Sequence, residues 1–142
     1  MKKRFYALLA LAVGFIFARV IDDSYNANPG SVKAAIDALV AMPGRHLLVL
    51  GDMAELGSKE KSMHREIGVY ARDAGVDGLH TTGVLSAEIA VAFGEGGEHF
   101  ADKAALSAAL ASQLNADAVV LVKGSRSAAM EDVVARIIEE ND

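Results

Sequence analysis

The chain has 142 residues, which is the length of one domain and enough to bury a core without disulfides or a structural metal. It contains no cysteine, which excludes a disulfide framework and a thiolate zinc site, and its 52% hydrophobic residues exclude a disordered chain. A net charge of −5 is unfavourable for gripping phosphate backbones, so no nucleic-acid partner is predicted.

The first 18 residues differ in composition from the rest of the chain. Three basic residues at positions 2–4 precede an uninterrupted apolar run over residues 5–18. This run is shorter than the roughly 20 residues of a spanning helix and fits the roughly 7–15 of a secretion-signal core. We expect residues 1–18 to form a short apolar N-terminal helix. Two kinds of interpretation remain open for residues 1–18. The segment contacts a membrane, as a secretion signal or a marginal anchor, or it is a non-native segment or a helix packed on the next domain.

Residues 19–142 predict a single domain of alternating strands and helices. A short β-rich segment at residues 19–25 leads into a helix at Asn28-Pro29, because Asn is a good N-cap and Pro suits the first helical position. Residues 46–50 form a continuous apolar run, which is typical of a strand covered on both faces.

The second half of the sequence continues the same alternation. Helical periodicity predicts a helix over about residues 58–74, with His64 facing solvent and Gly75 ending the helix. The elements that follow are a strand at 78–82, a helix at 86–93, a strand at 98–100, a helix capped by Asp102, a strand at 118–122 and a helix from Ser127.

This order predicts an α/β fold: a Rossmann-like, mostly parallel sheet with helices on both faces. Ligands of such sheets bind at the carboxyl ends of the strands. Polar turns follow the first, second and last predicted strands, at residues 22–26, 51–53 and 123–126. We therefore expect these three turns to meet at one edge and to form a ligand site.

The first turn carries side chains that suit a nucleoside. Tyr25 and Asn26 stand just before a helix, where a ring can stack on a base and an amide can bond a base or ribose. Asn28 is explained by its role as the N-cap alone. Asp22 and Asp23 are neighbours on a strand and point to opposite faces, so they do not form an acid–base dyad.

The last turn carries two cations, Lys123 and Arg126, at the start of a helix. Together with free backbone N–H groups they would bind a phosphate or a carboxylate. Alternatively, these cations pair with Glu131 or Asp132 on the following helix. Both interpretations remain open from the sequence.

The middle turn, residues 51–57, contains two carboxylates that could bind an amine or a cation, or form a capping loop. The sequence contains no GxxxxGK[ST] phosphate loop and no nucleophile elbow. Its four histidines stand on separate predicted elements without the spacing of metal ligands. We therefore assign no catalytic residue and no metal site.

Four strings occur in order: Asp-Asp-Ser-Tyr-Asn-Ala-Asn-Pro at 22–29, Leu-Val-Leu-Gly-Asp-Met-Ala-Glu-Leu-Gly at 48–57, His-Arg-Glu-Ile-Gly at 64–68 and Val-Leu-Val-Lys-Gly-Ser-Arg-Ser at 120–127. Over about residues 18–140 the chain resembles the C-terminal domain of the Mur ligases. The resemblance is strongest to members that add D-alanyl-D-alanine to a UDP-N-acetylmuramoyl tripeptide.

The resemblance implies a cytoplasmic enzyme of peptidoglycan synthesis that uses ATP and Mg²⁺. Such enzymes phosphorylate a carboxylate of the UDP-muramyl peptide, and the incoming amine attacks the acyl phosphate. The phosphate loop and the metal ligands belong to a central domain that nothing in this sequence resembles. The chain is therefore expected to need the missing ligase domains as partners and not to ligate alone.

The resemblance also implies roles for ten residues in two groups. The group expected against the base and ribose of ATP is Asp23, Tyr25, Asn26 and Asn28. The group expected at the substrate carboxylates and along the same cleft is Lys123, Ser125, Arg126, Asp52, Met53 and Glu55.

Two other functions remain as alternatives. One is a non-catalytic, membrane-anchored binding module that uses residues 1–18. The other is a receiver-like signalling domain, which also has an acidic pair after its first strand and a lysine after its last. Spacing argues against the receiver, because Asp52 follows Asp23 by only one predicted helix, whereas a receiver's acceptor aspartate lies two helices beyond.

Overall fold

The structure is a computed structural model that describes the backbone of residues 4–12 and 14–141 and the side chains of residues 18–139. Its strands are β1 (Arg4–Ala12), β2 (Gly14–Asp23), β3 (Arg45–Leu50), β4 (Gly78–Thr82), β5 (Gly97–Phe100) and β6 (Ala118–Lys123). Its α-helices are α1 (Pro29–Val40), α2 (Glu60–Ala74), α3 (Ala87–Phe93), α4 (Lys103–Ala111) and α5 (Glu131–Asn141). Two short 3₁₀ turns are η1 (Gly57–Lys59) and η2 (Arg126–Ala128).

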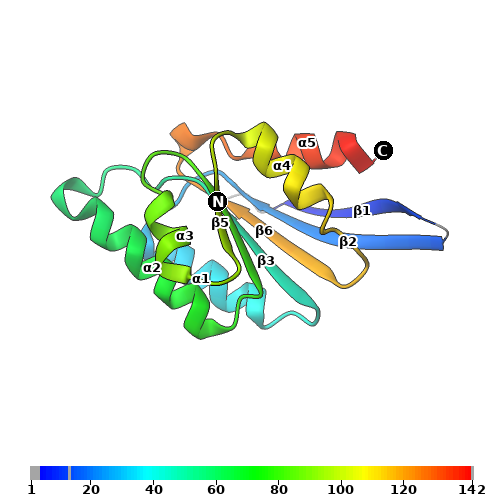
Figure 1. The fold of residues 1–142 in the computed structure, drawn as a ribbon, viewed down its shortest axis with the longest axis horizontal. Coiled ribbons are helices and arrows are strands. Elements are labelled where there is room, and N and C mark those ends of the chain that lie inside the picture. Colours follow the sequence, from blue (N-terminus) through cyan, green and yellow to red (C-terminus); the bar gives the residue numbers. More distant parts are fainter. Residues whose placement is uncertain (1–3, 13, 142) are drawn as a thin grey trace.

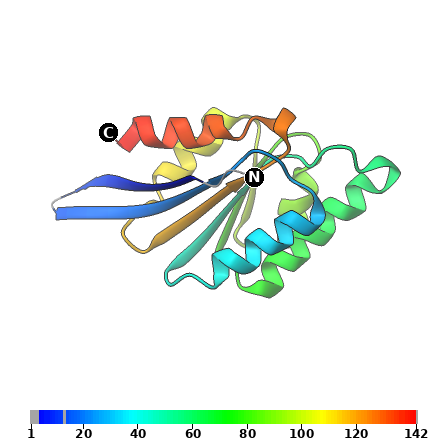
Figure 2. The ribbon, with the colours of Figure 1, turned by 180° about the vertical axis from the view of Figure 1, so that it is seen from behind.

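The strands form one twisted sheet in the order β1-β2-β6-β3-β4-β5 (Figure 1). The five strands from β2 to β5 are parallel, and only β1 is antiparallel to its neighbour. Helices α1, α2 and α3 cover one face of the sheet, and α4 and α5 cover the other (Figures 1 and 2). The predicted fold class, a Rossmann-like parallel sheet with helices on both faces, is confirmed.

Apolar residues of the central strands supply both faces of the core. In β3, Leu48 and Leu50 pack with the α1–α3 layer, whereas Leu47 and Val49 pack with the α4–α5 layer. Every residue of β6 is buried in the same two-sided way. The alternation explains why these strands read as continuous apolar runs, and burying each large side chain contributes about 1.5–3 kcal/mol.

The predicted N-terminal helix is wrong. Arg4–Ala12 forms β1, which pairs antiparallel with β2 from Arg4 opposite Asp22 to Ala12 opposite Gly14. The apolar run over residues 5–18 contains three phenylalanines, a tyrosine and an isoleucine, and aromatic and β-branched residues favour strands. Residues 1–3 and 13, also part of the predicted segment, lie outside the described residues. Within the described part of the chain, none of the helices has the length and apolar character needed to cross a membrane.

Candidate functional site

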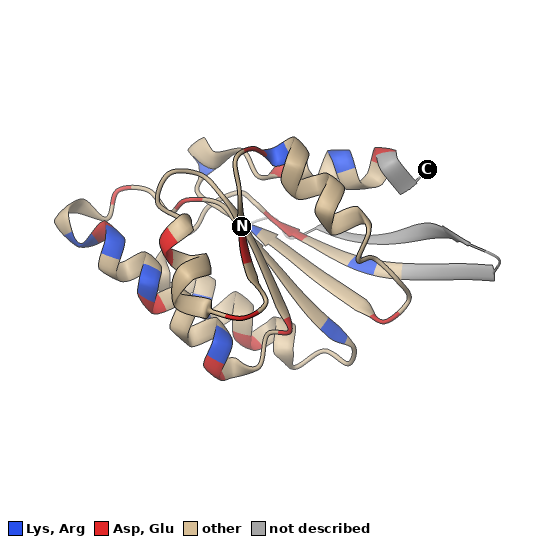
Figure 3. Cartoon of the chain, viewed as in Figure 1, with Lys and Arg blue, Asp and Glu red and all other residues tan. Residues whose placement is uncertain are grey.

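The three polar turns predicted from the sequence lie at one edge of the sheet. The register places Asp23 beside Lys123, and Lys123 beside Leu50, so β2, β6 and β3 end side by side. In Figure 3 the interior of the sheet is largely free of charge, and charged residues stand near the strand ends. The turns that carry the predicted site residues therefore start from adjacent strands, as the parallel order requires.

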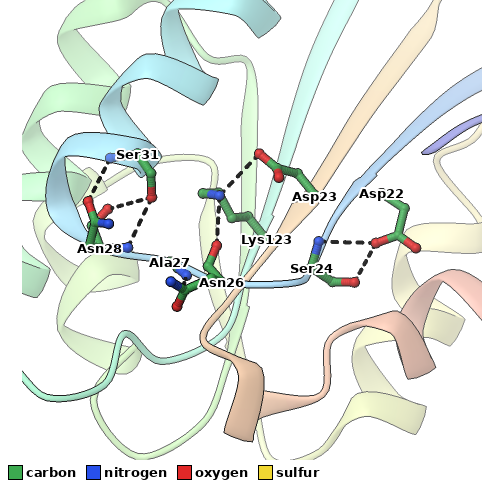
Figure 4. A network of polar contacts seen from close by, with 8 residues as sticks. All are labelled: Asp22, Asp23, Ser24, Asn26, Ala27, Asn28, Ser31 and Lys123. Atoms are coloured by element: carbon green, nitrogen blue, oxygen red, sulfur yellow. Dashed lines mark hydrogen bonds and ion pairs between the residues drawn. The ribbon is translucent and has the colours of Figure 1, made fainter. Parts of the chain in front are cut away.

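The loop between β2 and α1 is held by its own side chains (Figure 4). Asp22 Oδ1 accepts hydrogen bonds from the backbone N–H of Ser24, at 3.1 Å, and from the Ser24 hydroxyl. Asn26 Oδ1 accepts from the backbone N–H of Ala27 at 2.9 Å. Tyr25 makes no polar side-chain contact with the described residues and is 58% exposed, so its ring is open to a ligand.

Asn28 is the N-cap of α1, as predicted. Its side chain accepts from the backbone N–H of Ser31 at 2.9 Å, and the Ser31 hydroxyl accepts from the backbone N–H of Asn28 at 3.0 Å. These two reciprocal bonds form a capping box and satisfy two donors at the start of the helix. The cap occupies the side-chain oxygen of Asn28 and leaves its amide N–H groups at an exposed position.

Lys123 does not stand at the surface as a free cation. Its side chain is fully buried, and its Nζ lies 3.1 Å from Asp23 Oδ2 and 2.8 Å from the Asn26 carbonyl oxygen (Figure 4). The lysine therefore joins the end of β6 to the β2–α1 loop. Asp23 Oδ1 is buried and has no hydrogen-bond partner among the described residues.

The Asp52 side chain also makes structural hydrogen bonds and is not free for a ligand. Its carboxylate accepts from the backbone N–H groups of Val84 at 2.9 Å, Leu85 at 3.0 Å and Ser86 at 2.7 Å. These bonds fix the loop that leads into α3. Gly83 makes room for the carboxylate, because a Cβ there would lie 2.4 Å from Asp52 Oδ1 and the residue has φ +125°.

The backbone of Asp52 links the middle turn to the last one. Its carbonyl oxygen accepts from the backbone N–H of Ser125 at 2.8 Å, and the hydroxyls of Ser125 and Ser127 are 3.1 Å apart. Arg126 is exposed and forms an ion pair with Glu131 at 2.9 Å. This is the alternative pairing considered for the cation, although the arginine remains on the surface of the same edge.

Met53 is buried, and its backbone N–H donates to Nε2 of His64 at 3.0 Å. His64 Nδ1 is 2.6 Å from the Glu60 carbonyl oxygen, and its side chain is fully buried. The prediction that His64 faces solvent is wrong. Its spacing to Ile67 and Ala71, two other buried residues of α2, already places it on the apolar face of the helix. Glu55, at the tip of the same turn, is exposed with φ +60°.

A cavity of about 590 Å³ opens beside these turns, on the side of the sheet covered by α4 and α5. Of the predicted site residues, Asp52 and Ser125 line it. Lys103, from the start of α4, and Arg136, from α5, add two cations that the sequence analysis missed. Lys103 follows the carboxyl end of β5, so the rule that ligands bind where parallel strands end could have found it.

Lys103 is held in place by two acceptors. Its Nζ donates to the Ala129 carbonyl oxygen at 3.0 Å and forms an ion pair with Asp132 at 3.1 Å. These contacts leave one of its three N–H groups for a ligand. The edge therefore combines an exposed aromatic ring at Tyr25 with a cation-bearing cavity. The buried contacts of Lys123 and the loop contacts of Asp52 hold the turns around them.

Comparison with known proteins finds both similar sequences and similar structures. The family described as "Mur ligase, glutamate ligase domain" matches residues 13–126. The UDP-N-acetylmuramoyl-tripeptide–D-alanyl-D-alanine ligase of Escherichia coli K12 is 50% identical over 124 residues, which are 86% of this chain and 27% of that protein. The Bacillus subtilis ligase of the same name is 35% identical over 131 residues, 84% of this chain and 28% of the relative. The chain thus spans about a quarter of the length of these relatives.

Solved structures give the same result. MurF from Acinetobacter baumannii superposes with a TM-score of 0.80 at 28% identity, over 86% of this chain and 28% of that one. MurF ligase from Thermotoga maritima in complex with ADP gives 0.73 at 30% identity, over 85% of this chain and 28% of that one.

Proposed function

This chain belongs to the Mur ligase family, and we propose that it supplies the C-terminal domain of an ATP-dependent ligase that joins D-alanyl-D-alanine to a UDP-N-acetylmuramoyl tripeptide. The names of the relatives in Escherichia coli and Bacillus subtilis support these substrates. We place the activity in the cytoplasm and assign the chain no nucleic-acid partner. The remaining ligase domains are its proposed partners, because the chain matches 27% of the Escherichia coli relative.

The observation that carries the proposal is the geometry of the β2–α1 loop. Tyr25 presents an exposed ring, and the side-chain amide N–H groups of Asn26 remain available beside it. A purine base would stack on the ring and accept from the amide. Asp23 and Asn28 contribute to the same site by holding the loop, Asp23 through its ion pair with Lys123 and Asn28 through the helix cap. A Thermotoga maritima relative in complex with ADP supports a nucleotide as the ligand.

The cavity under α4 and α5 is the proposed place for the incoming dipeptide. Its volume of about 590 Å³ lies within the usual range of small-molecule sites, roughly 300–1,000 Å³. Lys103 and Arg136 would hold the dipeptide's carboxylate, with the hydroxyls of Ser125 and Ser127 completing the contacts. The turn beside the cavity is formed by Asp52, Met53 and Glu55. Arg126 lies exposed at the same edge of the sheet.

The chain's own part in the reaction is to bind and orient. Holding the nucleotide and the amine at adjacent turns of one rigid sheet edge lowers the entropic cost of bringing them together. ATP supplies the phosphoryl group that activates the peptide carboxylate. Among the described residues no three His, Asp or Glu side chains cluster as a metal site, so the residues present here do not fit Mg²⁺.

A receiver function is disfavoured by the contacts of Asp52. A phosphoacceptor carboxylate must be free to attack, whereas this one accepts three backbone N–H groups. Phosphorylation would therefore break the hydrogen bonds that hold the loop before α3.

An ADP titration of the isotope-labelled 142-residue chain tests the nucleotide site. We expect weak, saturable changes in amide NMR signals concentrated in residues 22–28. Because stacking contributes about 1–3 kcal/mol, Tyr25→Ala should weaken binding by roughly tenfold or more. Val69→Ala, an exposed apolar position on α2, is the matched control and should bind ADP as the parent chain does. Changes spread evenly over the surface, or equal affinity of the two variants, would contradict the proposal.

A further inference from the structure

A second polar cavity, of about 320 Å³, lies at the opposite edge of the sheet. It is formed where β3, β4 and β5 begin, with Arg45, His80 and Glu98 from the strands and Gln113 from the segment after α4. The proposed ligase site lies where the strands end, so the two sites are separated by the length of the sheet. Nothing in the proposed function uses this cavity.

A directed chain of hydrogen bonds runs along the cavity wall. Arg45 Nη2 donates to Gln113 Oε1 at 3.3 Å, and Gln113 Nε2 lies 2.9 Å from His80 Nε2. Because arginine can only donate, it fixes the amide orientation of Gln113, and the amide N–H₂ then faces the histidine ring. His80 Nε2 is therefore the acceptor, and the ring proton resides on Nδ1.

The Nδ1–H group of His80 is the end of this chain and is left without a partner. His80 is 3% exposed and stacks on Phe100, with 5.7 Å between ring centroids. Its Nδ1 is buried with no hydrogen-bond partner in the described part of the protein. An unpaired buried donor is unfavourable, so a ligand that brings an acceptor to this position relieves that penalty. Burial lowers the pKa of His80, with Arg45 acting in the same direction and Glu98 opposing it, which favours the neutral ring.

Two acidic residues, Glu98 and Asp77, line the same cavity. Glu98 stands beside His80 in the register of β4 and β5, and it forms no hydrogen bond or ion pair among the described residues. Asp77 also lines the cavity, but its carboxylate already accepts from the backbone N–H of His46 at 2.8 Å. The cavity thus places donors at Arg45 and His80 next to a free carboxylate at Glu98.

This arrangement selects among ligand classes. A simple anion would satisfy His80 but would be repelled by Glu98 and Asp77. A simple cation would pair with Glu98 but would leave the His80 N–H unpaired and would meet the Arg45 charge. A small molecule with a carboxylate at one end and an ammonium at the other satisfies both sides, and 320 Å³ holds a free amino acid but not a nucleotide.

We propose that the cavity binds a small zwitterion of the α-amino acid class, with its carboxylate on His80 Nδ1–H and Arg45 and its ammonium on Glu98. The site is independent of the proposed ligase function, and it can be tested on the chain alone.

Glycine is the probe, titrated into the ¹⁵N-labelled 142-residue chain while the imidazole ¹⁵N signals of the four histidines are followed. We expect the His80 Nδ1 signal to move and saturate, with the other three rings unaffected. Acetate and methylammonium, which each carry half of the zwitterion, should give less than a tenth of the response at equal concentration. No saturable response to glycine, or an equal response to acetate, overturns the proposal and leaves only water in the cavity.

Paired variants separate the site from a general effect of charge. Glu98→Gln and Arg45→Gln should each weaken glycine binding at least tenfold, whereas Glu139→Gln and Arg72→Gln remove exposed charges elsewhere and should not. Glu98 is exposed and unpaired, so Glu98→Gln retains the fold and keeps the test decisive. Unchanged glycine affinity in Glu98→Gln overturns the proposal, and the ADP titration at the other edge reads out the ligase function separately.

Discussion

At the level of single residues, the buried ion pair of Lys123 and Asp23 links the last strand to the loop proposed to hold a nucleotide. Both side chains are almost completely excluded from water, at 0% and 1% exposure. Removing one partner leaves the other charge buried and unpaired, which typically lowers the free energy of unfolding by about 3–5 kcal/mol. We expect Lys123→Met to lower the free energy of unfolding by about that amount, measured by urea denaturation.

Two companion variants isolate the cause. Asp23→Leu combined with Lys123→Met removes both charges and should recover most of the loss, because a matched apolar pair replaces a buried ion pair at little cost. Lys33→Met breaks a more exposed pair with Glu66 and should cost less than about 1 kcal/mol. If Lys123→Met costs no more than Lys33→Met, the buried pair does not have the role assigned to it here.

His80 gives the protein a dependence on pH. Burial is the main cause that holds its pKa below the ordinary value of 6.5. Above pH 6.5 the ring is neutral in the folded and unfolded chains and contributes no difference. As the pH falls below 6.5, the unfolded chain takes up a proton that the folded chain resists, so the free energy of unfolding falls.

Urea denaturation at pH 7.5 and pH 5.5 measures this dependence. His80→Gln should lose less stability between the two pH values than the parent chain does. Val69→Ala, at an exposed apolar position on α2, should retain the parent's slope. An identical slope in all three proteins would assign the pH dependence to other groups.

At the level of elements, Asp52 fixes the entry to α3 from a different strand. Its carboxylate, just after β3, accepts three backbone N–H groups of the loop that leads into α3, and losing such hydrogen bonds costs about 1–3 kcal/mol. Asp52→Ala should destabilise the chain by roughly that amount and speed amide hydrogen exchange most strongly in Ala87–Phe93. Asp102→Ala removes the cap of α4 and should speed exchange in Lys103–Ala111 instead. Uniform acceleration in both variants would show that the effect of Asp52 is global rather than local.

Most elements could be predicted from the sequence because their signals are local. The Asn28-Pro29 start of α1 and the apolar runs of β3 and β6 depend on neighbouring residues and on burial by two helix layers. The prediction for the N-terminal segment failed because the length and hydrophobicity of an apolar run do not distinguish a short helix from a hairpin strand. The segment forms a strand because it pairs with β2, and the local pattern of apolar residues does not reveal such pairing.

At the level of the whole molecule, the parallel order of the strands made the location of the candidate site predictable. It brings the turns after β2, β3 and β6 to one edge whatever side chains they carry. The state of each side chain was not predictable in the same way. Whether Lys123 faces a ligand or Asp23 depends on a contact across 100 positions of the chain, and the Lys103 contribution to the cavity depends on how α4 packs beside α5.

The same whole-molecule arrangement predicts that the isolated chain has no ligase turnover. Phosphoryl transfer is accelerated mainly by charges and donors placed around the phosphates. The sequence has no phosphate loop, and the described residues contain no metal-binding cluster. With ATP, Mg²⁺, UDP-N-acetylmuramoyl tripeptide and D-alanyl-D-alanine, we expect phosphate release at the background rate, while the full-length Escherichia coli relative serves as the positive control. Release that requires both the tripeptide and the dipeptide would mean that the sheet edge itself stabilises the transferring phosphoryl group, and the division of labour proposed here would then be wrong.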